Sequence, residues 1–94
     1  MIVLNVTYKC RAGMREAFLK RIIDDGIGKA SREEDGNIKY DYYIPVDSCD
    51  ELLLVEKWRD DAALTLHAST EHFARLKELK PVYVLDTVVE RYGK

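Results

Sequence analysis

Two kinds of apolar spacing alternate along this chain, and their order is the feature that most restricts its fold. Apolar residues recur at every second position in residues 2–9, which is the period of a β-strand. Residues 14–27 instead repeat them at intervals of three and four, as an amphipathic helix does. Further strands are expected at residues 37–46, 51–58 and 82–91, and a second long helix at 71–79. The predicted order is strand, helix, strand, strand, helix, strand.

Glycines and polar clusters predict where these elements end. Gly26 and Gly28 interrupt the first helical pattern, so we expect a break there and a short helix through residues 31–35. Gly36 is expected to end that short helix. The polar residues 47–50 form a turn between two strands, which predicts a hairpin.

Capping residues predict a pair of helices in the second half of the chain. An aspartate at residues 60–61 can cap a short helix that reaches about His67, and a hydroxyl residue at 69–70 can cap the longer helix that follows. Pro81 is expected to stop this helix.

This order of elements predicts an α+β, ferredoxin-like single domain that spans residues 1–94. Its helices would cover one face of a four-stranded antiparallel sheet. Val3, Tyr43, Leu53 and Val55 would make the other face partly apolar. A chain this short buries only about two-thirds of its unfolded surface, so a second copy would help to cover that face. We therefore expect a homodimer that packs sheet to sheet, as a dimeric α/β barrel.

Composition narrows the classes of function. The formal charge is −2 and the charges alternate in sign, which favours neither a nucleic-acid partner nor a membrane partner. No apolar run approaches the ~18 residues of a membrane span, and the first residues do not resemble a signal peptide. Cys10 and Cys49 stand apart without metal-ligand spacing, so both are expected to be free thiols. These features predict a soluble, cytoplasmic protein.

The single Trp and a carboxylate lie close together in the third predicted strand. Strand alternation places Glu56 and Trp58 on one face with Leu52 and Leu54. If that face meets the helices, Glu56 is a candidate catalytic base with a raised pKa, and Trp58 borders a substrate cavity. An equally good interpretation is that Trp58 belongs to the core and that Glu56 pairs with a Lys or Arg.

The two histidines are the other catalytic candidates. His67 ends a short helix and His72 begins the next, so their side chains are expected to converge on one cavity. A metal site of two histidines needs a third ligand, and none is close in the sequence, so we expect no metal site. The alternatives are a hydrogen bond from His67 that ties helix to sheet and a packing role for His72.

Aromatic residues and one amide are candidates for substrate binding. Tyr40 and Tyr42 share a strand face, and Phe73 follows His72; all three suit a flat phenolic ligand, although strand aromatics are more often core. Asn5 is the only amide in the first strand, and it could belong to the dimer interface instead. The charged residues 32–35 are interpreted as a solvated helix end.

Three motifs together resemble the antibiotic biosynthesis monooxygenase family. The segment at residues 31–40 is followed by Glu56-Lys57-Trp58 and then by His67 and His72-Phe73, in the order and spacing of that family. The resemblance covers nearly the whole chain. Two positions depart from the pattern: Asn37 stands where many members carry Cys, and Leu54 stands where the polyketide-tailoring branch has an active-site Asn.

The resemblance implies a small dimeric α+β barrel and, for some members, oxygenation of quinols or phenolic polyketides without a cofactor. It therefore suggests a monooxygenase, an oxidoreductase acting on a small aromatic quinol or phenolic compound. The same acid and base groups would also serve an isomerase that moves a proton on a carbonyl compound. A non-catalytic dimeric protein that binds a ligand is the third possibility.

Overall fold

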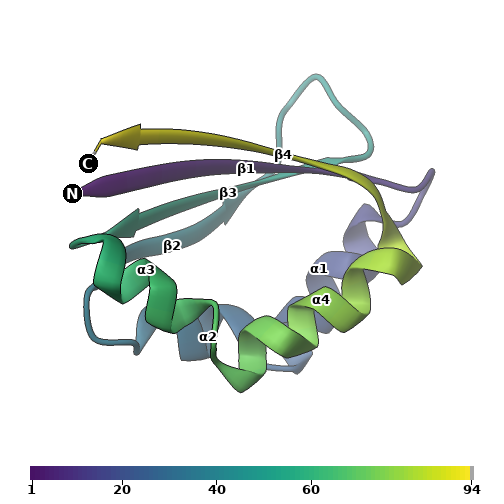
Figure 1. The fold of residues 1–94 in the computed structure, drawn as a ribbon. Coiled ribbons are helices and arrows are strands. Elements are labelled where there is room, and N and C mark those ends of the chain that lie inside the picture. Colours follow the sequence, from purple (N-terminus) through teal and green to yellow (C-terminus); the bar gives the residue numbers. More distant parts are fainter. Residues whose placement is uncertain (94) are drawn as a thin grey trace.

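The chain folds into a four-stranded antiparallel sheet with helices on one face (Figure 1). A computed structural model describes residues 1–93. Among these residues, no helix is both long and apolar enough to cross a membrane. The elements in chain order are β1 (Ile2–Cys10), α1 (Arg15–Asp24), α2 (Ile27–Arg32), β2 (Asn37–Tyr43), β3 (Glu51–Trp58), α3 (Asp61–His67), α4 (Glu71–Tyr83) and β4 (Val84–Gly93).

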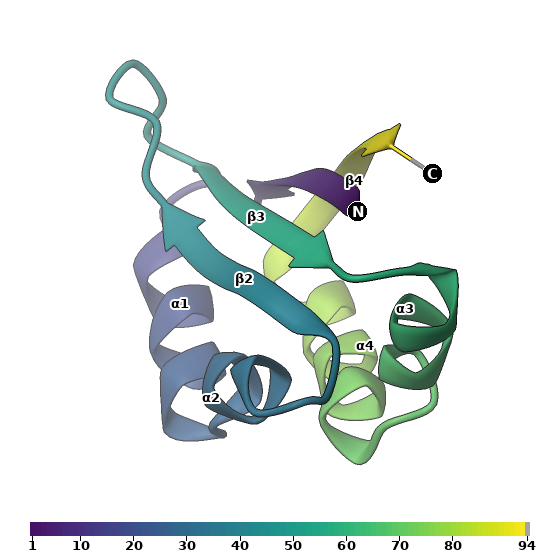
Figure 2. The ribbon, with the colours of Figure 1, turned by 90° about the vertical axis from the view of Figure 1, so that its left-hand side faces the viewer.

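The strand order β2-β3-β1-β4 confirms the predicted ferredoxin-like α+β fold. The two central strands, β1 and β3, pair along their whole length, from Ile2 opposite Trp58 to Lys9 opposite Glu51. Figure 2 shows α1 and α2 below the β2 side of the sheet and α3 and α4 on the other side. Each helical region of the chain is a pair of helices, as the sequence predicted.

Strand alternation sorts the side chains of the sheet. In β3, Leu52, Leu54, Glu56 and Trp58 are buried against the helices, whereas the residues between them are half-buried on the outer face. The even-numbered residues of β1 are buried in the same way, beside Phe18 and Ile22 of α1. This layer between sheet and helices is the hydrophobic core.

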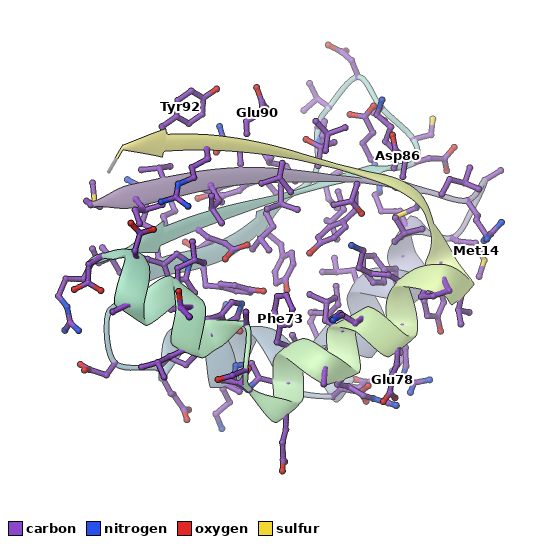
Figure 3. The ribbon with its side chains drawn as sticks, viewed as in Figure 1. Met14, Phe73, Glu78, Asp86, Glu90 and Tyr92 are labelled. Atoms are coloured by element: carbon purple, nitrogen blue, oxygen red, sulfur yellow. The ribbon has the colours of Figure 1, made fainter. Side chains whose placement is uncertain are left out.

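No helix covers the outer face of the sheet among the described residues. Val3 lies between Lys57 and Tyr92 on neighbouring strands, and Asn5 lies between Val55 and Glu90. Figure 3 shows Tyr92 and Glu90 pointing away from the helices. Tyr92 is 52% exposed, so this face leaves apolar surface uncovered.

The second short helix and the strand β2 have boundaries that differ from the sequence prediction. The helix after the glycine break is Ile27–Arg32 rather than 31–35, because only Gly26 adopts a left-handed conformation, with φ of 67°, and Gly28 lies inside the helix. A side chain at Gly28 would crowd those of Tyr42 and Arg32, each 3.2 Å from the added Cβ. The strand β2 ends at Tyr43, before Pro45.

The prediction that Pro81 stops the last helix was wrong. The helix α4 continues through Pro81 to Tyr83, and β4 begins only at Val84. The proline lacks an N–H and its ring crowds the carbonyl four residues earlier, so the final turn depends on contacts from outside the helix. The Arg11 amide donates to the Tyr83 carbonyl at 2.8 Å, and the Tyr83 ring packs on Phe18 at 5.7 Å between centroids.

Candidate active site

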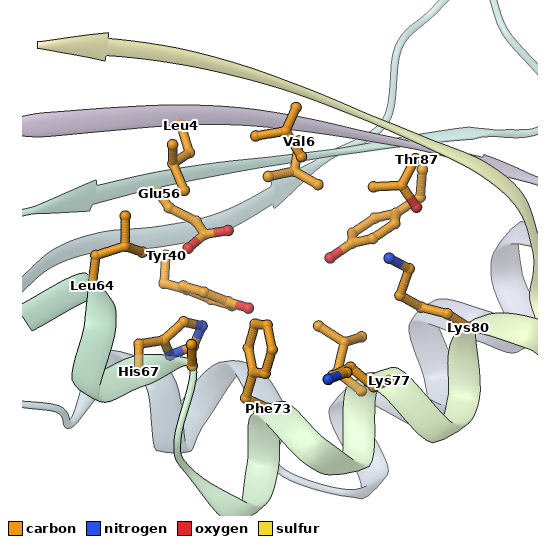
Figure 4. A pocket seen from close by; sticks show the side chains of 14 residues that line it. Leu4, Val6, Tyr40, Glu56, Leu64, His67, Phe73, Lys77, Lys80 and Thr87 are labelled. Carbon is orange, nitrogen blue, oxygen red and sulfur yellow. The ribbon is translucent and has the colours of Figure 1, made fainter. Parts of the chain in front are cut away.

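A mostly apolar cavity lies between the sheet and the helices α3 and α4. Its volume is about 250 Å³, just below the range of about 300–1,000 Å³ typical of ligand pockets, so it suits a small ligand. Leu4, Val6 and Tyr8 of β1 line it, with Val89 of β4 beside them. Figure 4 shows the side chains that converge on it, among them Tyr40, Glu56, His67, Phe73, Lys77 and Lys80.

A carboxylate bridges two histidines, and one of them, His67, lines this cavity. Glu34 follows α2, His67 ends α3 and His72 lies in the first turn of α4. Glu34 Oε2 lies 2.6 Å from His67 Nδ1 and 2.7 Å from His72 Nε2. The link between the helices is also fixed, because the Thr70 hydroxyl donates to the His67 carbonyl at 2.8 Å and accepts from the Phe73 amide. Three separate helices therefore hold one hydrogen-bonded cluster.

His67 is buried, which favours its neutral form. It is 2% exposed and packs against Trp58, with ring centroids 4.7 Å apart. Burial lowers the pKa of His67, and the hydrogen bond and charge of Glu34 oppose that shift. When the Glu34 carboxylate accepts from Nδ1, the proton of the neutral ring sits on Nδ1 and the lone pair on Nε2. If Nε2 takes up a proton, Glu34 stabilises the imidazolium.

Glu56 is the second titratable group in the cavity. Burial raises the pKa of Glu56 to about 7, against a hydrogen bond from Trp58 that lowers it, and the charge of Glu34 adds to the increase. The indole Nε1–H donates to Glu56 Oε1 at 3.0 Å. Near neutral pH this carboxyl therefore exists in both forms, and it can give or take a proton.

Four of the eight residues predicted for the site line the cavity, and four do not. Glu56, His67, Tyr40 and Phe73 line it. Trp58 is 0% exposed and contacts Glu56 and His67 without lining the cavity. His72 is linked to the lining residue His67 through Glu34. These two are therefore positioned to support the site.

Tyr42 and Asn5 are corrections to the predicted substrate-binding set. Tyr42 borders a different hollow, between β2 and the α1–α2 break, with Gly28 and Arg32. Asn5 lies on the outer face of the sheet, since strand alternation turns it away from the buried Leu4 and Val6.

The sequence did not indicate Glu34, Lys77 or Lys80 as residues of the site. The charged residues 32–35 are not simply a solvated helix end, because Arg32 donates to the Tyr40 carbonyl at 2.7 Å and Glu34 holds both histidines. No local signal marks Glu34. Helical spacing could have found the lysines, because Lys77 and Lys80 follow Phe73 by four and seven residues and so share its face.

The cluster also supplies the third potential metal ligand that the sequence did not reveal. The ligand atoms of Glu34, His67 and His72 lie within 4.8 Å of one another. Ligand atoms around one tetrahedral zinc ion lie roughly 3.3 Å apart, since each is about 2.0–2.1 Å from the metal. The 2.6 and 2.7 Å contacts are hydrogen-bond distances, so a metal would have to push the cluster apart.

Comparisons with known proteins place this geometry in a family. Residues 1–79 match the sequence profile of the family described as antibiotic biosynthesis monooxygenase. A Bacillus subtilis (strain 168) protein named "Putative monooxygenase YcnE" is 37% identical over 83 residues, which cover 84% of this chain and 85% of that protein.

Two solved structures share the fold over almost the whole chain. PA3566 of Pseudomonas aeruginosa superposes with a TM-score of 0.87 at 29% identity, covering 99% of this chain and 92% of the other. SO0527 of Shewanella oneidensis gives a TM-score of 0.89 at 24% identity, with 99% and 89% covered. On the extent of the profile match and of the identity to the Bacillus protein, the chain belongs to the antibiotic biosynthesis monooxygenase family.

Proposed function

We propose that this protein is a cofactor-independent monooxygenase that oxidises a small aromatic quinol or phenol. The observation that carries the proposal is the position of His67, which lines an apolar cavity and is hydrogen-bonded at Nδ1 to Glu34, 2.6 Å away. Membership of a monooxygenase family supports the reaction class. The volume of about 250 Å³ suits a substrate of one or two fused rings.

In this proposal the substrate supplies the electrons and the protein manages the proton. His67 Nε2 accepts the proton of a substrate hydroxyl, and the resulting aryl oxide passes one electron to dioxygen. The radical pair combines to form a carbon–oxygen bond, and the oxygen–oxygen bond then breaks. For a naphthalene diol, oxidation of the diol to the quinone and replacement of a ring C–H by C–OH each supply two electrons. One oxygen atom enters the ring, and the other leaves as water with the two hydroxyl hydrogens.

The surrounding residues each have a part in that scheme. Glu34 stabilises the imidazolium form of His67, and Glu56 is placed to return a proton to the departing oxygen. Tyr40 and Phe73 bound an aromatic slot, and the apolar lining keeps water from the radical pair.

The test is oxygen uptake by the purified protein with a panel of benzene diols, naphthalene diols and anthrones. We expect uptake above the uncatalysed rate with at least one of them, and loss of that excess in His67→Ala. Uptake no faster than in buffer for every compound, or an unchanged rate in His67→Ala, would reject the proposal. Lys20→Gln, at an exposed lysine on α1 paired with Asp24, is the control for handling and folding.

A proton-transfer reaction on a carbonyl compound is the second candidate. It is favoured by the presence of two proton-transfer groups, Glu56 and His67, in one cavity. Such an isomerase needs no oxygen, so the protein would exchange substrate C–H for deuterium in anaerobic deuterium oxide. Exchange that requires His67, in the absence of any oxygen uptake, would select this candidate.

We also propose that two copies pack through the uncovered outer face of the sheet, in the cytoplasm. The half-buried Val3, Leu53 and Val55 at the centre of that face support the dimer, since they leave apolar surface unpartnered in one chain. Both cysteines are free thiols, which fits a reducing compartment.

A further inference from the structure

Two ammonium groups stand at the opposite end of the cavity from the proton-transfer residues. Lys77 and Lys80 line the cavity one helical turn apart on α4, while Glu56 and His67 lie toward α3 (Figure 4). Each lysine is directed over an aromatic ring of the lining. Lys77 Nζ lies 5.9 Å from the centroid of Phe73, and Lys80 Nζ lies 5.8 Å from that of Tyr8.

Neither of these positive charges forms an ion pair with a carboxylate in the part of the chain that the structure describes. Among residues 1–93, every ion pair involves other basic groups. Asp86 borders the adjoining shallow hollow that both lysines share with Thr87, but it pairs with neither. Two like charges at a spacing of three on one helix face repel each other, so the arrangement favours an anion between them.

The remaining charges of the cavity decide which way such a ligand would lie. Glu56 lines the α3 end and is partly ionised near neutral pH, and the Glu34 carboxylate lies beside His67, so an anionic group would be repelled there. The apolar surface of Val6 and Phe73 lies between the two ends and suits the flat part of a ring system (Figure 4). The cavity therefore has an anion-binding end, an apolar middle and a proton-transfer end.

We propose that the substrate of this site is an aromatic compound with a negatively charged substituent, a carboxylate or a phosphate, held by Lys77 and Lys80. This inference rests on the proposed function for the identity of the reacting hydroxyl, which then faces Glu56 and His67. The charged substituent fixes the direction in which the ring enters. It also gives selectivity, because a neutral quinol of the same size leaves both lysines without a partner.

Binding of unreactive ligands tests the inference without any turnover. The probes are naphthalene-2-carboxylate and 2-naphthyl phosphate, with naphthalene-2-carboxamide as the neutral ligand of matched shape. By calorimetry at low ionic strength, we expect at least one anion to bind about 10-fold or more tightly than the carboxamide, as a charge-assisted contact provides. Which anion binds more tightly distinguishes a carboxylate substrate from a phosphate one.

Variants of the lysines connect that preference to the site. In Lys77→Gln/Lys80→Gln the preference for the anion should fall to about 2-fold or less, while the carboxamide affinity stays unchanged. Lys77→Arg/Lys80→Arg should keep the preference, and Lys20→Gln on α1 should behave as the unaltered protein. Equal binding of the three ligands, no binding of any of them, or a preference that survives loss of both lysines would overturn the inference.

A kinetic comparison separates this inference from the proposed function. Oxygen uptake is compared for naphthalene-1,4-diol and for the same diol with a carboxylate on carbon 2. We expect the carboxylate to lower KM, and the double glutamine variant to remove that difference. Uptake without a preference for the anion would overturn the inference and leave the proposed function standing. A lysine-dependent preference for the anion in binding, together with no oxygen uptake, would overturn the proposed function and leave this inference standing.

Discussion

Glu34 accepts a hydrogen bond from Nδ1 of His67 at 2.6 Å, although 33 residues separate the two in the chain. We expect Glu34→Gln to lower kcat by about 10²-fold with little change in KM, since general-base catalysis contributes about 10²–10⁴-fold and part of it depends on this orientation. Steady-state oxygen uptake measures the effect.

The neighbouring carboxylate provides the matched control for that variant. Glu33 is exposed, one residue away, and lies outside the cluster, so Glu33→Gln should leave kcat unchanged. Equal rates in both variants would mean that Glu34 only holds structure.

Glu56 should make the stability of the protein fall as the pH rises. Its pKa is about 7 in the folded chain against an ordinary value of 4.5, so the folded state binds more protons between these two values. Stability therefore decreases from about pH 4.5 to about pH 7 and then levels off, by an amount on the order of 3 kcal/mol. Glu56→Gln should remove this loss and be the more stable protein at pH 8. Denaturant unfolding at pH 5 and pH 8, at one protein concentration, checks it, and parallel curves for the two proteins would contradict it.

Gly36 should tolerate no side chain. Its φ is +88°, and an added Cβ would lie 2.5 Å from the Cβ of Ala63 on α3. Gly36→Ala should cost about 2 kcal/mol or more, from backbone strain together with the collision. Gly13 has a φ of +73° with nothing near its missing Cβ, so Gly13→Ala should show only the backbone part, about 1 kcal/mol. Similar losses for the two variants would show that the contact with Ala63 relaxes freely.

Removal of metal ions should leave activity unchanged. The contacts of Glu34 with His67 and His72 are already those of hydrogen bonds, and the proposed chemistry takes its electrons from the substrate. We expect the same oxygen uptake before and after dialysis against a chelator, with metal content measured by mass spectrometry. A rate that disappears on dialysis and returns with a transition-metal ion would instead make the cluster a metal site.

A charge at the centre of the outer face should weaken association. Val55 lies opposite Asn5 and Asp41 on its neighbours, in the middle of the uncovered sheet. Val55→Lys should move the molar mass in light scattering from that of two chains toward that of one. Val46→Lys is the control, because Val46 is 96% exposed on the β2–β3 loop. A mass of two chains for Val55→Lys would argue against sheet-to-sheet packing.

The sequence predicted what depends on local periodicity. The alternation of Leu52, Leu54, Glu56 and Trp58 was sufficient to place these four on one strand face, because a strand turns every second side chain the same way. The structure shows that this face meets the helices. Asp60 and Thr70 cap α3 and α4 through side-chain oxygens, as residues 60–61 and 69–70 had indicated.

Contacts between distant parts of the chain lay beyond that reasoning. In the sequence, Glu34 is one more charge in a charged stretch. Only in the folded chain do α3 and α4 bring the two histidines beside it. In the sequence, Pro81 predicts the end of a helix. In the folded chain, the contact of Tyr83 with Phe18 stabilises the last turn beyond it. In each case tertiary packing, which has no local pattern, overrides the local preference.

The two faces of each strand carry separate tasks, so the parity of a residue number in β3 predicts what its substitution alters. Even positions, such as Glu56, face the helices and the core, and odd positions, such as Val55, lie on the outer face through which we propose that two chains associate. Chemistry and assembly can then change independently in evolution, through residues that are adjacent in the sequence. A shift of the β3 register by a single residue would exchange the two sets, so the pairing of Ile2 with Trp58 protects both tasks at once.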